Sequence, residues 1–134
     1  MPRDFRELKV WQKSHRLTLS VYNVTRTFPP EERYGLISQM RRASISIAAN
    51  LAEGCGRDGP SNVSRFFDMA LGSASELDYF VVLARDLGFL GGPAYERLAR
   101  DITEIKKMLT SLIQKTRTLP TSAPATRGPG LRAD

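Results

Sequence analysis

Apolar residues recur every three or four positions through most of this chain, and this pattern predicts four helices. The first helix is expected from about residue 5 to residue 27, with Asp4 as its N-cap. Prolines and glycines at 29–30, 54–60 and 88–93 separate the periodic segments, because these residues end helices or favour turns. The sequence therefore predicts an all-α fold, an antiparallel up-down-up-down four-helix bundle.

The segment 36–57 differs from an ordinary surface helix because it is apolar on two sides. One apolar face holds Leu36, Met40, Ile47 and Leu51, and a second holds Ile45, Ala49 and Ala52. A polar strip separates them and consists of Gln39, Arg42, Ser46, Asn50 and Glu53. Two interpretations remain open: a central helix packed by neighbours on both sides, or a polar strip at a subunit interface or lined channel.

Polar groups removed from water need partners, so the polar strip should form a satisfied network under either interpretation. Glu76, in the third predicted helix, is a candidate partner for Arg42. We therefore treat the strip together with Glu76 as a candidate polar network or oligomer interface.

Helical periodicity stops after about Arg117, and composition changes there. We expect residues 1–117 to form the bundle domain and residues 118–134, rich in Pro, Gly, Ser, Thr and Ala, to form a flexible basic tail. A single cysteine excludes an internal disulfide and fits a reducing compartment. Since no run approaches the ~20 apolar residues of a membrane span, the expected location is the cytoplasm.

The net charge of +6 permits binding to nucleic acid but does not establish it. Basic side chains on the first helix fall within an arc of roughly 80° and are Arg6, Lys9, Lys13 and Arg16. Such a row is either a solvated face or a phosphate-binding surface. Further candidate cations are Arg41, Arg57 and Arg65. Most aromatic residues fall on predicted core stripes, which argues against base stacking.

Nothing in the sequence assembles an active site. His15 is the only histidine, and its position near Trp11 and Tyr22 predicts a residue at the edge of the core rather than a general base. Cys55 has no obvious base nearby and is interpreted as structural. No Glu-x-x-His pair for a di-iron site and no glycine-rich phosphate loop after a strand are present. We therefore expect no catalytic residue, no metal, no cofactor and no enzymatic activity.

Two stretches, QMRRASISIAANLAEGCGR (39–57) and SRFFDMALGSASELDYFVVLARDLGFL (64–90), closely resemble the four-helix bundle family of the 23S rRNA intervening sequence proteins. The residues that match the pattern of this family are Gln39, Arg42-Ala43, Ser46-Ile47, Asn50, Ala52-Glu53-Gly54, Gly72-Ser73 and Glu76-Leu77. The resemblance covers roughly residues 4–115 and leaves out the tail.

This resemblance implies a bundle that assembles as a homopentamer and has no enzymatic activity. Some genes of the family lie inside ribosomal RNA genes, and relatives in diversity-generating retroelements are basic pentamers that bind a reverse transcriptase and nucleic acid. We therefore expect a non-catalytic oligomer that binds the RNA or DNA backbone. The alternative is an interaction scaffold for a reverse transcriptase or another nucleic-acid-associated protein, without nucleic-acid binding of its own.

Overall fold

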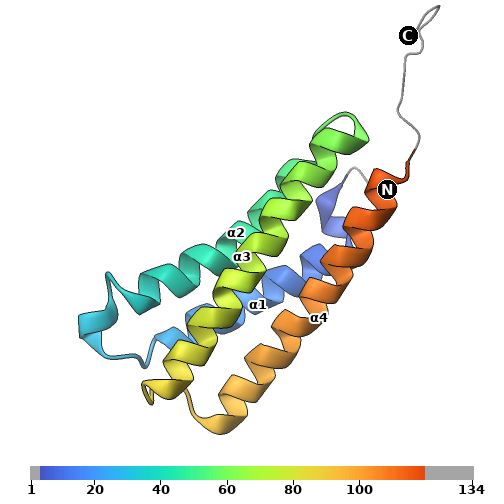
Figure 1. Cartoon of the computed structure of the whole chain (residues 1–134). Coiled ribbons are helices and arrows are strands. Elements are labelled where there is room, and N and C mark those ends of the chain that lie inside the picture. The colour runs from blue at the N-terminus through green and yellow to red at the C-terminus, as the bar shows by residue number, and fades with distance from the viewer. Residues whose placement is uncertain (1–3, 120–134) are drawn as a thin grey trace, which may run out of the picture.

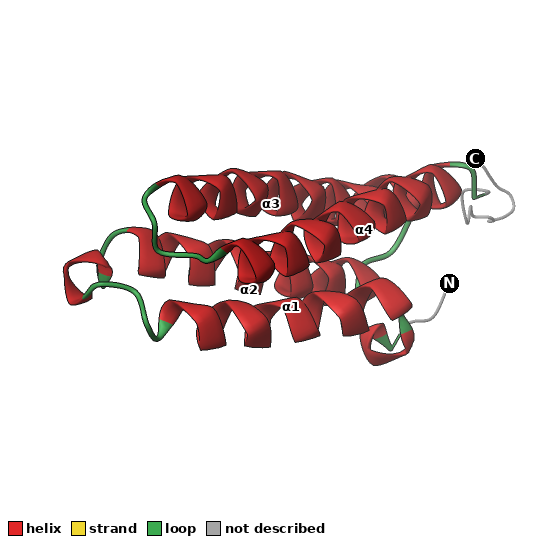
Figure 2. Cartoon of the chain, turned by 90° about the horizontal axis from the view of Figure 1, so that it is seen from below, coloured by secondary structure: helices red, strands yellow, loops and turns green. Residues whose placement is uncertain are grey.

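The computed structural model describes residues 4–119, and every regular element within them is helical. Two short 3-10 helices, η1 (Phe5–Glu7) and η2 (Pro30–Glu32), accompany four α-helices. The α-helices are α1 (Lys9–Thr25), α2 (Leu36–Cys55), α3 (Pro60–Asp86) and α4 (Gly92–Arg117) (Figures 1 and 2). The all-α prediction is confirmed, whereas residues 120–134 of the predicted tail lie outside the described residues.

The first helix is shorter than the sequence predicted, because its opening turn is a separate element. Asp4 accepts a hydrogen bond from the backbone N–H of Arg6 at 3.0 Å, so it caps η1 and not α1. Extended backbone at Leu8 then separates the two helices and allows this side chain to be buried. Gln12 fastens η1 to α1 by donating its Nε2–H to the carbonyl of Arg6 at 2.8 Å.

The turn between α2 and α3 also differs from expectation. A left-handed C-cap is predicted at Gly54 or Gly56, but Gly54 is helical and Gly56 has a φ of −90°. The left-handed residue is Gly59, with a φ of 83°, directly before Pro60 opens α3. Gly54 is needed for a different reason, since a Cβ there would lie 2.7 Å from the Phe67 ring. The glycine lets α3 approach the α2 backbone closely.

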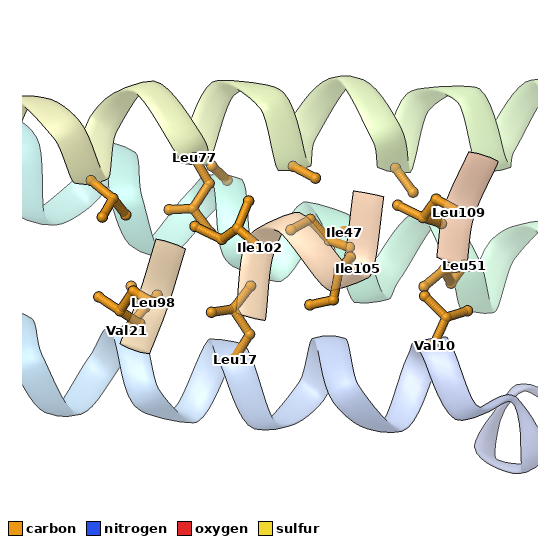
Figure 3. Packing of buried hydrophobic residues seen from close by; sticks show 14 of the residues in the cluster. Val10, Leu17, Val21, Ile47, Leu51, Leu77, Leu98, Ile102, Ile105 and Leu109 are labelled. Carbon is orange, nitrogen blue, oxygen red and sulfur yellow. The ribbon is translucent and has the colours of Figure 1, made fainter. Parts of the chain in front are cut away.

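Each helix packs against its neighbours in the chain, and α4 also packs against α1. The four helices thus enclose a single core, to which every helix contributes aliphatic side chains (Figure 3). Leu98, Ile102, Ile105 and Leu109 of α4 all point into it, as the period of that segment predicts. Leu87, which the sequence pattern places on the core face, is 52% exposed, because six residues beyond Val81 it lies about 120° around the helix from that buried residue.

Candidate nucleic-acid interface

In the basic row predicted on the first helix, two side chains form ion pairs with carboxylates of the protein and two do not. Arg6 contacts the Asp4 carboxylate at 3.1 Å, so its charge is offset locally. Lys9 and Arg16 are exposed, and neither has an acidic partner within residues 4–119. These two side chains remain available for an external anion.

Lys13 is the member of the basic row that forms ion pairs with another helix of the bundle. Its Nζ lies 2.6 Å from Glu104 and 3.5 Å from Asp101, both on α4. The hydrogen bond to Glu104 raises the pKa of Lys13, and the same bond lowers the pKa of Glu104. Lys13 therefore ties α1 to α4 and contributes little positive charge to the surface.

The predicted supporting cations are likewise engaged within the protein. The Nε–H of Arg41 donates to the Thr25 hydroxyl at 2.9 Å, and its guanidinium lies 4.4 Å from the centre of the Tyr22 ring. This arginine ties α2 to α1 and is half-buried.

Arg57 and Arg65 lie at the other end of α2 and at the start of α3. Arg57 pairs with Glu53, one turn earlier on α2. Both guanidiniums lie 4.8 Å from the centre of the Phe66 ring, and Arg65 also donates to Asn62 at 3.3 Å. In the sequence, these two arginines are far from the basic row on α1, and both of their guanidiniums contact the same Phe66 ring.

A groove between the start of α1 and the last turns of α4 gathers cations that the sequence does not place together. It has a volume of about 450 Å³ and is lined by Leu8, Lys9, Val10, Lys107, Met108, Ser111, Leu112 and Lys115. In Figure 1 the blue beginning of the chain lies at the same end of the bundle as the red end of α4. Within the described part of the chain, none of these three lysines forms an ion pair.

Sequence reasoning missed Lys107 and Lys115, although a signal for them exists. The two lysines are separated by about two helical turns and lie on one side of α4. By contrast, cations of α4 on the side of α3 are neutralised: Lys106 lies 3.4 Å from Asp78, and Arg117 lies 2.5 Å from Asp68. Lys107 and Lys115 therefore keep uncompensated charge at this end of α4, as Arg97 and Arg100 do nearer its start.

The polar strip of α2 is only partly a network. Asn50 donates to the carbonyl of Ser46 at 2.9 Å and to its hydroxyl at 3.0 Å, and the Ser73 hydroxyl of α3 donates to the same Ser46 oxygen at 2.8 Å. These contacts join α2 to α3. The remaining residues point outward: Glu53 pairs with Arg57, while Gln39, Arg42 and Glu76 are exposed.

The expected bridge between Arg42 and Glu76 is not formed, and across residues 4–119 neither side chain has an ion-pair partner. The second apolar strip of α2 also faces outward, with Ile45 43% exposed. On α3, Met69 and Tyr79 are exposed as well, by 46% and 60%. A single chain therefore leaves these apolar side chains of α2 and α3 exposed.

The link between Lys13 and Glu104 predicts a pH window for part of the stability. The lowered pKa of Glu104 stabilises the fold above the ordinary value of 4.5, and this contribution is lost as pH falls. The raised pKa of Lys13 stabilises the fold below its ordinary value of 10.5, and this contribution is lost as pH rises. Lys13→Met should therefore lower the free energy of unfolding by a small, salt-sensitive amount only between these two values.

Urea unfolding of the parent and of Lys13→Met, at about pH 7 and again at about pH 2.5, measures this difference. We expect the difference in free energy of unfolding between the two proteins to disappear at the acidic pH. A gap of the same size at both values would mean that packing of the lysine stem, and not its ion pair, sets the effect.

The expectations for His15, Cys55, metal binding and membrane spans can be compared with the structure over residues 4–119. His15 lies beside Trp11, as its position predicts, but it is exposed and not at the core edge. Cys55 is buried. Over the range that the structure describes, no group of three His, Cys, Asp or Glu side chains is arranged to hold a metal ion, and no helix has the length and apolarity of a membrane span.

Comparisons with known proteins agree with this architecture. A crystal structure of a protein of unknown function from the S23 ribosomal protein family of Bacteroides thetaiotaomicron is similar, with a TM-score of 0.73 and 25% sequence identity. The similarity covers 78% of this chain and 98% of the other. No curated protein matches the chain.

The match to a family is more extensive than any short motif. Residues 6–111 match the family model described as 23S rRNA-intervening sequence protein, which confirms the resemblance drawn from the sequence. Neither this family nor the similar structure indicates a catalytic activity. The chain belongs to the 23S rRNA-intervening sequence protein family.

Proposed function

We propose that this protein is a non-catalytic oligomer that binds the phosphate backbone of RNA or DNA. The binding surface is the α1–α4 basic face, defined as Lys9, Arg16, Lys107 and Lys115. The observation that carries the proposal is the groove in which the three lysines of this face converge, with no acidic partner for any of them among residues 4–119. Clustered cations of this kind release counterions when they meet a phosphate backbone, which favours binding.

Assembly belongs to the same proposal. Short connections between consecutive packed helices support the up-down-up-down order. The exposed apolar residues Ile45, Met69 and Tyr79 support a self-associating surface on α2 and α3, with five subunits as the expected number. Several copies of the basic face in one particle would then strengthen weak contacts through avidity.

A protein-interaction scaffold is the second candidate function, and the floor of the groove favours it. Leu8, Val10, Met108 and Leu112 make this floor largely apolar, whereas a phosphate backbone gains little from apolar contact. The partner would be an acidic segment of a protein such as a reverse transcriptase or another nucleic-acid-associated protein.

Binding of the full chain to a structured RNA and to duplex DNA, measured by fluorescence anisotropy at several salt concentrations, separates the two candidates. Backbone binding predicts affinity that falls steeply with salt and depends little on sequence. Light scattering of the protein alone and with RNA gives the mass of the particle. A salt-independent affinity would overturn the phosphate proposal, and a single-chain mass would overturn assembly. Absence of binding to either nucleic acid would favour the scaffold.

A further inference from the structure

One side of α1 carries a series of flat side chains that the core covers only in part. Trp11, His15 and Tyr22 are spaced four and seven residues apart, which places them on the same side of the helix. The Trp11 and His15 rings are stacked with centroids 5.1 Å apart and planes inclined by 4°. The guanidinium of Arg41 lies over Tyr22. We call these four residues the stacking stripe.

The stacking stripe differs from the buried aromatics because solvent reaches it. His15 is exposed, and the other three members are half-buried, whereas Phe67 in the core is fully buried. Part of the stripe has a structural role, since the edge of Phe5 packs against Trp11 at 4.8 Å and so holds η1 in place. That role does not account for His15, which lies on Trp11 one turn further along α1.

We propose that the stacking stripe binds unpaired nucleobases, so that the protein prefers single-stranded RNA or DNA. This inference rests on the proposed function, because the phosphates of the same strand would contact the α1–α4 basic face. Every nucleobase has a π-face that stacks on aromatic rings, on histidine or on the guanidinium plane of arginine. The stripe offers all three kinds of surface, with the rings on α1 and the guanidinium on α2.

The dimensions of the stripe fit this ligand. His15 and Tyr22 are seven residues apart, which is about 10.5 Å along a helix axis. At a base spacing of about 3.4 Å, about three steps of a stacked strand span the same length. Arg16 directly follows His15 and belongs to the basic face, so base contacts and backbone contacts occupy adjacent sides of α1.

The prediction that most aromatics lie on core stripes is met only in part on α1. Trp11 and Tyr22 flank the buried stripe of α1 and do not enter it fully.

The test compares two probes that carry the same charge and differ only in their bases. One is a thymidine oligonucleotide about 20 nucleotides long, and the other is an abasic oligonucleotide of the same length. We expect the full chain to bind the thymidine probe at least about fivefold more tightly, because each stacked base adds affinity. Trp11 is the only tryptophan, so quenching of its fluorescence by the thymidine probe alone reports stacking directly.

Two variants of His15 assign the effect to the stripe. His15→Ala should lower affinity for the thymidine probe toward that for the abasic probe and leave abasic binding unchanged. His15→Phe retains a flat ring and should keep the preference. Thr103→Ala, an exposed residue of α4, is the control and should change neither affinity.

The outcomes separate this inference from the proposed function. Equal affinity for the two probes, or a preference that survives in His15→Ala, would overturn the stacking proposal while phosphate binding stands. Absence of binding to both probes at low salt would overturn both. A thermal unfolding curve for each variant confirms that His15 acts through binding and not through folding.

Discussion

Replacing Phe67 with alanine is expected to lower the free energy of unfolding by about 3–5 kcal/mol. The Phe67 ring is fully buried, and it fills the space that Gly54 leaves between α2 and α3. Truncation removes apolar contacts and leaves a cavity that the close helix contact cannot fill by collapse. Urea unfolding followed by circular dichroism, at one fixed protein concentration, measures the loss.

Phe66→Ala is the matched control for this variant. Its ring is only half-buried and lies beneath the guanidiniums of Arg57 and Arg65. We expect it to lose less than half as much stability as Phe67→Ala, since solvent already reaches the ring. Equal losses for the two variants would contradict the packing described here.

The second large effect concerns nucleic-acid binding. Replacing Lys9, Lys107 and Lys115 together with glutamine should weaken binding to RNA by at least about tenfold at low salt, because three phosphate contacts are lost. The slope of log affinity against log salt should become shallower by about 2–3, since each contact contributes about 0.7–0.9. Fluorescence anisotropy over a salt series gives both quantities.

The chain provides a control with the same change in net charge. Arg6, Lys106 and Arg117 already contact carboxylates, so replacing these three with glutamine should change the slope much less. If both triple variants weaken binding equally, overall charge rather than the α1–α4 basic face determines affinity.

The helices of this fold were predictable because burial imposes a period on the sequence. Residues such as Leu98 and Ile102 are buried where the period of their segment places them. The helix ends were less predictable, because they depend on local competition. Asp4 caps a separate short helix, and the left-handed residue after α2 is Gly59 and not Gly54 or Gly56.

The candidate interface was only half visible in the sequence. A helical wheel places Lys9 and Arg16 on one face of α1, but it cannot show that α4 brings Lys107 and Lys115 beside Lys9. It also cannot show that Lys13 is neutralised from α4. These facts depend on contacts between segments nearly 100 residues apart in the chain.

The half-buried aromatics of α1 show a related limit to what the sequence can predict. A helical wheel gives the direction of a side chain but not its depth, so it does not show that Trp11 and Tyr22 are only half-buried. Burial depends on how closely α2 approaches α1 beside these rings. The sequence alone does not contain this distance.

The contact between Gly54 and Phe67 has a consequence for how this chain can change in length. An insertion or deletion of one residue in α2 before Gly54 would turn the preceding part of the helix by about 100° relative to that contact. Where the change falls between Asn50 and Gly54, Ser46 would turn away from α3 and lose its bond to Ser73, whereas the bonds between Asn50 and Ser46 lie within α2 and would be kept. Natural length variation in this protein should therefore be confined to the connecting turns and to the region beyond α4.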